Sequence, residues 1–191
     1  MHTAYHLTPT KLWEQIKESG SLEPRSLPTI VNHPSFCRGF LQAEKKLELG
    51  FNSNHVVGAL DSPDFNDWNE FGLYDSLLRK VSGAGKKCED ADYKELALLS
   101  FKVPSSAVVI DHYHVSPKTF IDIYGEDLWH MASETGLQTE ERCIIMDLQL
   151  HNYYDSVTRI TDYQNDFKVP EVWIPERISL EKITLEKVFT I

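Results

Sequence analysis

Long hydrophobic runs and basic residues are both scarce in this chain. No apolar stretch approaches the ~20 residues that a membrane-spanning helix needs, and the first residues lack the basic and apolar regions of a secretory signal. Lys and Arg total 19 against 29 Asp and Glu, a net charge of −10. Binding duplex phosphates over a broad surface needs Lys and Arg to release counterions. We therefore expect no membrane or duplex nucleic-acid partner, and a cytoplasmic location unless a route without a cleaved signal exports the chain.

Cysteine is scarce as well. Cys37, Cys88 and Cys143 lie far apart and form no Cys-x-x-Cys pair, which argues against a disulfide framework and a zinc ribbon. The Gly-x-Ser-x-Gly motif of hydrolases is missing. Residues 83–87 read Gly-Ala-Gly-Lys-Lys without the spacing or the Ser or Thr of a P-loop. A reducing compartment and no standard nucleotide loop are the expectations.

What is present describes a globular domain. The 191 residues are 41% hydrophobic and 11% aromatic, enough for a sizeable core. No internal repeat or low-complexity tract divides the chain, so we expect one domain spanning 1–191. Strand patterns outnumber helix patterns and the two are mixed, which indicates the α+β class.

Hydrophobic spacing and turn residues predict the individual elements. Strands are expected at 3–8, 55–60, 96–103, 107–115, 143–150, 169–174 and 184–191. Helices are expected at 9–19, 42–49, 66–81 and 119–129, and long loops at 21–34 and 82–92. Thr8 as a hydroxyl N-cap with Pro9 at the first helical position, and Gly20 after the last turn, mark the ends of the first helix. The strands at 96–103 and 107–115 are expected to pair with each other.

A histidine pair follows Asp111 at the end of the strand predicted at 107–115. Residues at i and i+2 of a strand share a face, so His112 and His114 could hold a metal together, as in a metal-dependent hydrolase. No third ligand has a recognisable spacing. The simpler interpretation is a pair of polar or hydrogen-bonded side chains, and no metal ligand is assigned.

Two stretches near the ends carry more information. Residues 5–8 read Tyr-His-Leu-Thr and are followed at 13–25 by W-x-x-I-x-x-x-G-x-L-x-P-R, while residues 170–183 read PEVWIPERISLEKI. The first stretch resembles the first strand and helix of ADP-ribosyltransferase-like proteins, toxin-like members included. The second resembles their last motif, in which a Glu opens a strand. Residues 56–68, VVGALDSPDFNDW, are similar to the strand, turn and helix between them, and the order of the three stretches strengthens the resemblance.

The resemblance implies a compact split antiparallel sheet core with flanking helices, and transfer of ADP-ribose from NAD to an acceptor. Glu171 would stabilise the oxocarbenium-like state near the 2′-hydroxyl of the nicotinamide ribose. His6 would hold the ribose on the adenosine side, and Arg25 would pair with the pyrophosphate. The catalytic residues are then Glu171 and His6, and the cofactor-binding set is Tyr5, His6, Thr8 and Arg25, with Arg38 as the backup for Arg25.

Two departures from the family pattern leave the activity and the acceptor open. The family usually stacks a Tyr of the middle strand on nicotinamide, where this chain has Leu60 and Asp61; Tyr74 and Tyr93 lie nearby in the sequence. Protein-modifying members commonly have Glu or Gln two residues before the motif's Glu, and Val169 stands there. A protein acceptor is favoured, a nucleic-acid base or small molecule is open, and transfer of an RNA 2′-phosphate to NAD is a minor variant. An inactive binding or immunity-type module on the same fold is the alternative.

Overall fold

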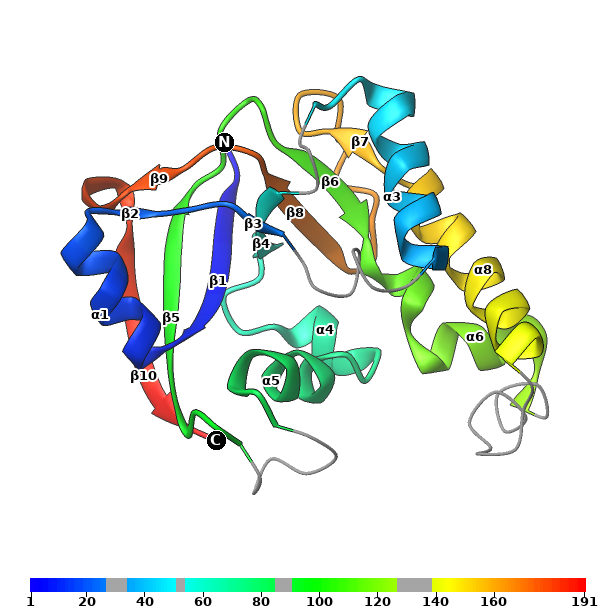
Figure 1. Ribbon diagram of the computed structural model, residues 1–191, viewed down its shortest axis with the longest axis horizontal. Coiled ribbons are helices and arrows are strands. Elements are labelled where there is room, and N and C mark those ends of the chain that lie inside the picture. Colours follow the sequence, from blue (N-terminus) through cyan, green and yellow to red (C-terminus); the bar gives the residue numbers. More distant parts are fainter. Residues whose placement is uncertain (27–33, 51–53, 85–90, 127–138) are drawn as a thin grey trace.

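A computed structural model describes residues 1–26, 34–50, 54–84, 91–126 and 139–191, without the side chains of 26, 34–38, 124 and 139–146. The strands are β1 Thr3–Pro9, β2 Ser21–Leu22, β3 Arg25–Ser26, β4 Asn54–Leu60, β5 Glu95–Lys102, β6 Val108–Asp111, β7 Thr158–Arg159, β8 Pro170–Ile174, β9 Ile178–Ser179 and β10 Thr184–Thr190. The helices are α1 Thr10–Ser19, α3 Pro34–Leu47, α4 Asn66–Glu70, α5 Tyr74–Ser82, α6 Pro117–Tyr124 and α8 Thr139–Asp155, with 3-10 turns η2 His112–Val115 and η3 Leu180–Lys182. The helices are interspersed irregularly among the strands along the chain, and the strands form a mostly antiparallel sheet (Figure 1). This arrangement is consistent with the α+β class.

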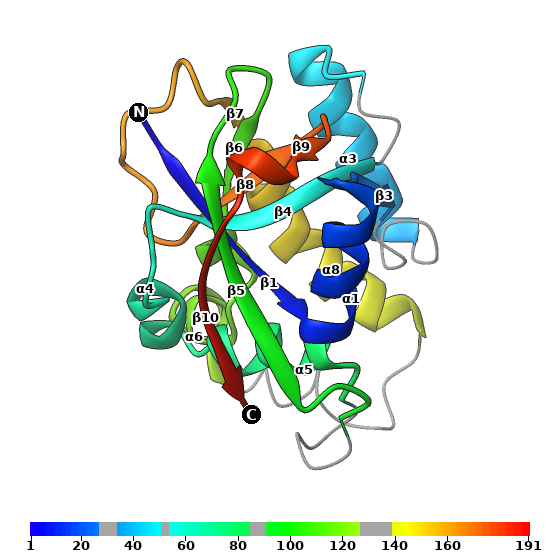
Figure 2. The same cartoon turned by 90° about the vertical axis from the view of Figure 1, so that its left-hand side faces the viewer.

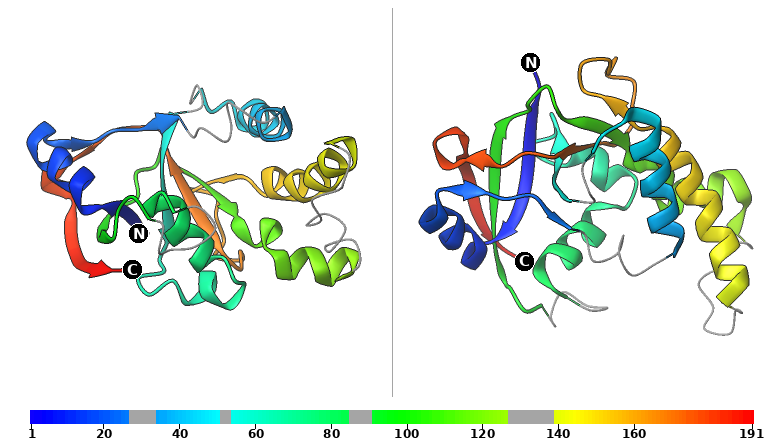
Figure 3. Two further views of the ribbon diagram at one scale, coloured as in Figure 1. Left: turned by 60° about the horizontal axis from the view of Figure 1, so that its bottom comes forward. Right: turned by 45° about the horizontal axis from the view of Figure 1, so that its top comes forward.

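The main sheet has the order β10-β5-β1-β4-β8-β6-β7, with β3 also paired to β4, and β2 pairs with β9 separately. β1 pairs with β5 along its whole length but meets β4 at two positions, Ala4↔Leu60 and Tyr5↔Ala59. Beyond Tyr5 the two strands part. The antiparallel strands β10, β5 and β1 then lie along a similar axis while β4 lies across it, as Figures 2 and 3 show. The sheet therefore divides between β1 and β4.

Three hydrophobic clusters cover the sheet. The first joins α1 to the sheet and includes Trp13, Ile16, Leu60, Leu99, Phe101, Val172 and Ile174. The second joins α3 and α8 to β6 and β8 and includes Phe40, Val108, Ile110, Leu150, Tyr153, Tyr154 and Trp173. The third joins α4 and the start of α5 to β1, β4 and β5 and includes Leu7, Ala59, Phe65, Trp68, Leu73 and Leu98. Burying each large apolar side chain contributes roughly 1.5–3 kcal/mol.

The first strand and helix lie where the sequence predicts them. β1 is followed directly by α1, whose Trp13 and Ile16 are buried. Gly20 ends the helix at φ 79°, the left-handed conformation that favours glycine, and donates its N–H to the carbonyl of Ile16. The predicted cap is wrong, since Thr8 belongs to β1 and no side chain caps the helix at its N-cap Pro9.

The strand predicted at 143–150 is wrong, because α8 spans Thr139–Asp155. The apolar stretch Cys-Ile-Ile-Met is too short for its spacing to distinguish a strand from a helix. The helix is decided further along, where Leu150, Tyr153 and Tyr154 are spaced by three residues and one and are all buried in the second cluster. Cys143 therefore lies on a helix.

The predicted pairing of 96–103 with 107–115 is also wrong. β5 pairs with β1 and β10, whereas β6 pairs with β8 and β7. The connection through Pro104, whose carbonyl accepts from the N–H of Ala107, carries the chain from one half of the sheet to the other. β6 is shorter than predicted and ends at Asp111, because the Asp111 side chain accepts the N–H of Tyr113 and starts η2.

The remaining elements differ mainly at their ends. The helix predicted at 66–81 is two helices, α4 and α5, separated at Gly72, whose φ of 70° interrupts a helix. α6 begins at Pro117, with Ser116 as its N-cap, and ends before Gly125. The predicted loop at 21–34 contains β2 and β3 and reaches the first residue of α3, and its residues 27–33 lie outside the described part. In the loop predicted at 82–92, residues 85–90 lie outside the described part too, while β4, β8 and β10 are close to their predicted ranges.

Among the described residues, no helix has the length and hydrophobicity to cross a bilayer.

Candidate functional site

Glu171 is the second residue of β8, and strand register decides what lies beside it. It pairs with Ala59 of β4 on one side and with Ile110 of β6 on the other. Ala59 in turn pairs with Tyr5 of β1, so these residues form one row across the sheet and their side chains share a face. This row is the last in which β1 and β4 pair. One strand, β4, therefore separates Glu171 from the point where the sheet divides.

The carboxylate of Glu171 is held between the second and third clusters and is 6% exposed. The Tyr153 hydroxyl donates to Oε1 at 2.8 Å, and the Trp173 indole N–H donates to the same oxygen at 2.6 Å. The other oxygen, Oε2, lies 2.9 Å from Nδ1 of His112. A buried carboxylate is costly unless it is paired and hydrogen-bonded, and these three partners meet that condition.

The three partners come from separate elements, each placed by its own local features. Trp173 follows Glu171 by two residues in β8, so both side chains lie on one face of the strand. Tyr153 reaches the carboxylate from the last turns of α8. His112 is the first residue of η2. Its backbone N–H donates to the carbonyl of Val169 at 2.8 Å, and this bond fixes His112 beside the start of β8.

The backbone before His112 is fixed by a second buried carboxylate, that of Asp111. It accepts three backbone N–H groups, those of Tyr113, Lys168 and Val169. Asp111 is thus a structural acceptor that ties η2 to the segment entering β8, and it thereby sets the distance between His112 and Glu171.

The pKa of Glu171 is lowered from 4.5 to about 2. Burial by itself would raise this pKa, but the charge and hydrogen bonding of His112, the charge of Lys80 and the indole N–H of Trp173 together outweigh it. The same arrangement raises the pKa of Tyr153 well above 10, through burial first and the neighbouring Glu171 carboxylate second. At neutral pH the site therefore contains an ionised carboxylate and a protonated phenol.

His6 lies one residue beyond the last β1–β4 pair, at the point where the strands part. Its Nδ1 is 2.7 Å from the carbonyl oxygen of Val57 in β4, so the ring replaces a backbone donor that β1 no longer supplies. Burial lowers the pKa of His6, the Val57 carbonyl opposes that effect, and the nearby charge of Arg25 lowers the pKa further. His6 is thus favoured in its neutral form, with Nδ1 as the donor to Val57.

The other residues expected to bind NAD are dispersed around the same division of the sheet. Arg25 is exposed on β3, where it pairs with His55 of β4, and its charge reaches His6. Thr8 is 4% exposed and shares the His6 face of β1 by alternation. Tyr5 lies on the opposite face, in the row of Glu171. The side chain of the backup residue Arg38 lies outside the described part.

Among the described residues no contact joins His6 to Glu171. They occupy successive rows of the sheet, so their side chains leave it on opposite sides, and two strand spacings of ~5 Å separate their strands. His6 borders the place where β1 and β4 separate, whereas β4 lies between that place and Glu171. The structure brings His6 near Arg25, and it places Glu171 with three residues that were not expected around it.

The predicted histidine pair does not share a strand face, because the strand ends at Asp111 and both residues belong to η2. Nδ1 of His112 faces Glu171, whereas Nδ1 of His114 is buried without a hydrogen-bond partner in the described part of the chain. Within the same residues, no group of three or more His, Cys, Asp or Glu side chains is arranged to hold a metal ion. The premise of the metal hypothesis was therefore wrong.

The middle-strand positions are structural. Asp61, at φ 52°, accepts the N–H of Thr3 at 2.7 Å and contacts the His2 ring at 2.6 Å, which ties the turn after β4 to the start of β1. Tyr74 contacts the Phe65 ring in the third cluster.

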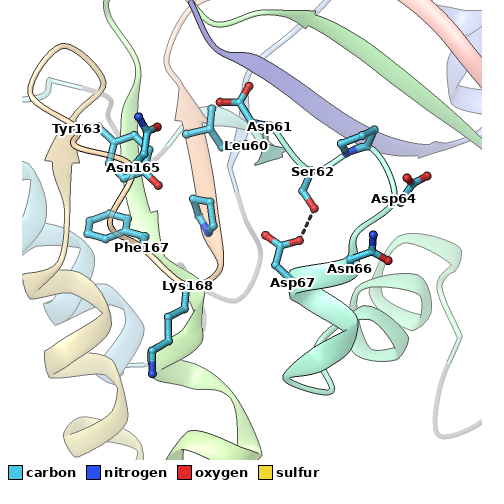
Figure 4. Close-up of a pocket in the computed structure, with 12 residues that line it drawn as sticks. Leu60, Asp61, Ser62, Asp64, Asn66, Asp67, Tyr163, Asn165, Phe167 and Lys168 are labelled. Atoms are coloured by element: carbon cyan, nitrogen blue, oxygen red, sulfur yellow. Dashed lines mark hydrogen bonds between the residues drawn. The ribbon is translucent and has the colours of Figure 1, made fainter.

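A cavity of about 470 Å³ lies between the loop after β4 and the loop before β8 (Figure 4). Its lining includes Asp61, Asp64 and Asp67, with Lys168 as the basic residue among its walls. Three carboxylates against one ammonium do not suit a pyrophosphate. None of the expected NAD-binding residues lines it, so we do not assign the cofactor to this cavity. A smaller hollow of about 320 Å³ is lined by Tyr5 together with residues of β5 and β10.

Sequence reasoning missed two partners of Glu171 and misjudged a third. Trp173 was part of the quoted motif, and the two-residue period of a strand would have placed it beside Glu171. His112 was expected either to hold a metal with His114 or to be polar or hydrogen-bonded, but no partner was named for it. Tyr153 was missed because its helix was predicted to begin as a strand, and no sequence signal relates it to Glu171.

No family model, curated protein or solved structure matches this chain.

Proposed function

We propose that the chain is an NAD-dependent ADP-ribosyltransferase in which Glu171 acts at the nicotinamide ribose. The observation that carries the proposal is the environment of Glu171: a buried, hydrogen-bonded carboxylate kept ionised at the start of β8, one strand from the division of the sheet. Cleavage of the bond between nicotinamide and ribose builds positive charge on the sugar. A fixed negative charge in a water-poor site stabilises that charge without having to reorganise.

The hydrogen bonds of Glu171 are compatible with this role. A carboxylate has about four lone-pair positions; Tyr153 and Trp173 donate to two of them, and the His112 ring faces a third from 2.9 Å. One position is then available to a ribose hydroxyl. In this proposal the neutral His6 holds the second ribose, and Arg25, whose charge reaches His6, pairs with the pyrophosphate.

A second candidate function is a binding module with the same fold and no chemistry. Three observations favour it: His6 and Glu171 leave the sheet on opposite sides, Glu171 is 6% exposed, and the middle strand ends in Leu60 and Asp61 without an aromatic side chain to stack on nicotinamide. In that case the Glu171 cluster would serve only to join α8, η2 and β8.

The test is release of nicotinamide from NAD by the purified chain, together with transfer of label from the adenylate portion to added protein. We expect activity in the wild type and a loss of about 100-fold or more in Glu171→Gln, by analogy with the loss of one electrostatic partner of a transition state. Glu181→Gln, an exposed carboxylate in η3, is the matched control and should behave as wild type.

His6→Ala should raise the KM for NAD more than it lowers kcat, because His6 is assigned to binding. Circular dichroism of each variant verifies that it is folded. Activity that persists in folded Glu171→Gln would refute the assigned role of Glu171. A wild type that binds NAD but releases no nicotinamide would instead support the binding module.

A further inference from the structure

His112 has two sides with different surroundings. Nδ1 is buried 2.9 Å from the Glu171 carboxylate. Nε2 is not among the buried nitrogens that lack a partner, and it makes no hydrogen bond with the described residues. With the side chain 21% exposed, Nε2 faces solvent. An imidazole whose Nδ1 faces a carboxylate and whose Nε2 is open has the geometry of an oriented base, because the carboxylate selects the tautomer with the proton on Nδ1.

The ring is also fixed in orientation by its neighbours. Trp68 of α4 stacks on it with ring centroids 4.6 Å apart, and Tyr153 meets it edge-on at 5.6 Å. Both neighbours are buried. The ring is therefore held between Trp68 and Tyr153, with Nδ1 directed toward Glu171.

The contact between Nδ1 and Oε2 is close but not well aligned, since the ring N–H does not aim straight at the oxygen. Hydrogen bonds of catalytic groups are often misaligned before the substrate binds and tighten in the complex.

We propose that His112 is the general base of the transfer, taking the proton of the acceptor while Glu171 orients it. This inference rests on the proposed function. The bond between ribose C1′ and nicotinamide breaks, and its electron pair leaves with neutral nicotinamide. The acceptor oxygen or nitrogen forms the new bond to C1′ and gives its proton to Nε2 of His112, which later releases it to water. With water as the acceptor the product is free ADP-ribose. One lone pair of the Glu171 carboxylate thus faces the sugar, and another lone pair of the same carboxylate faces His112.

The proposal is tested with a nucleophile that has no proton to lose. NAD is incubated with the full chain alone, where water is the acceptor, or with azide, and nicotinamide, ADP-ribose and ADP-ribosyl azide are quantified. His112→Asn keeps an N–H donor near the Nδ1 position and removes the base. We expect it to lose about 100-fold or more of hydrolysis, the usual contribution of a general base, while azide transfer stays within a few-fold of wild type.

Two controls interpret the result. Glu171→Gln should lose both reactions, and His151→Asn, an exposed histidine of α8, should lose neither. Hydrolysis by His112→Asn at the wild-type rate overturns the proposal and leaves the proposed function standing. Equal loss of hydrolysis and azide transfer also overturns it, because His112 would then act only by positioning Glu171. A wild type that releases no nicotinamide refutes the proposed function and this inference together.

One measurement needs no variant. In the ¹⁵N spectrum of the wild-type chain, the imidazole identified by its contacts to the Trp68 ring should have the proton on Nδ1 and none on Nε2 when neutral. The opposite tautomer would overturn the proposal whether or not His112→Asn folds.

Discussion

Replacing Glu171 by Gln also tests the electrostatics of the site through the stability of the fold. The pKa of Glu171 falls from 4.5 to about 2 on folding. One unit of pKa is worth about 1.4 kcal/mol, so the ionised carboxylate contributes roughly 3 kcal/mol of stability at neutral pH. Because the folded-state pKa is the lower one, this contribution is complete above the unfolded value and is lost as the pH falls from about 4.5 toward 2.

The assay is urea unfolding at several pH values, followed by tryptophan fluorescence and far-ultraviolet circular dichroism. Because the emission sums the four tryptophans of the chain, it follows unfolding of the whole protein, and far-ultraviolet circular dichroism provides an independent probe of the same transition. Between pH 4.5 and pH 3 the wild type should lose about 2 kcal/mol more of its free energy of unfolding than Glu171→Gln does. The exposed-carboxylate variant Glu181→Gln should follow the wild type. Parallel pH dependences of wild type and Glu171→Gln would refute the assignment of an ionised, stabilised carboxylate.

Three further predictions concern the frame around the site. Burial lowers the pKa of His55 from 6.5 to about 4, so the free energy of unfolding falls as the pH drops through that interval. In the same urea assay, the decrease between pH 6.5 and pH 5 should be about 2 kcal/mol smaller in His55→Gln than in the wild type. Gly39→Ala would bring its Cβ into collision with the Tyr154 ring, so we expect a loss of roughly 1–3 kcal/mol by thermal unfolding; an unchanged Tm would contradict the close approach of α3 and α8. Asp111→Ala leaves three backbone N–H groups without their acceptor and should cost about 3 kcal/mol or more, whereas a neutral effect in urea would show that Asp111 does not hold η2 against β8.

The separation of Glu171 from its partners along the chain explains which features the sequence revealed. Trp173 is two residues from Glu171 in the same strand, and His112 belongs to the histidine pair that the sequence analysis singled out. The sequence therefore identified both residues as candidates. Tyr153 and Trp68 are visible only when α8 and α4 are folded against the sheet. The apolar run at the start of α8 fits two periodicities equally well, and packing of its later residues against α3 decided between them.

Strand partners show the same division. The segments 96–103 and 107–115 are neighbours in the sequence, and a hairpin is the default for neighbouring strands. In the structure each segment joins a different half of the sheet, because β5 is hydrogen-bonded to β1 on one edge and to β10 on the other. The choice of strand partner depends on contacts between residues that are far apart in the sequence. No local sequence pattern encodes these contacts.

By itself, the sequence determined the mixed helix and strand content, the first strand and helix with its Gly20 ending, and the strand that Glu171 opens. Local spacing, turn residues and backbone freedom are sufficient for these features. Only the tertiary structure decided that Glu171 is buried with Tyr153, Trp173 and His112, that His6 leaves the sheet on the other side, and that β1 and β4 part between them. The reason is physical: the pKa of a carboxylate and the orientation of an imidazole depend on burial and on partners that folding supplies from distant parts of the chain.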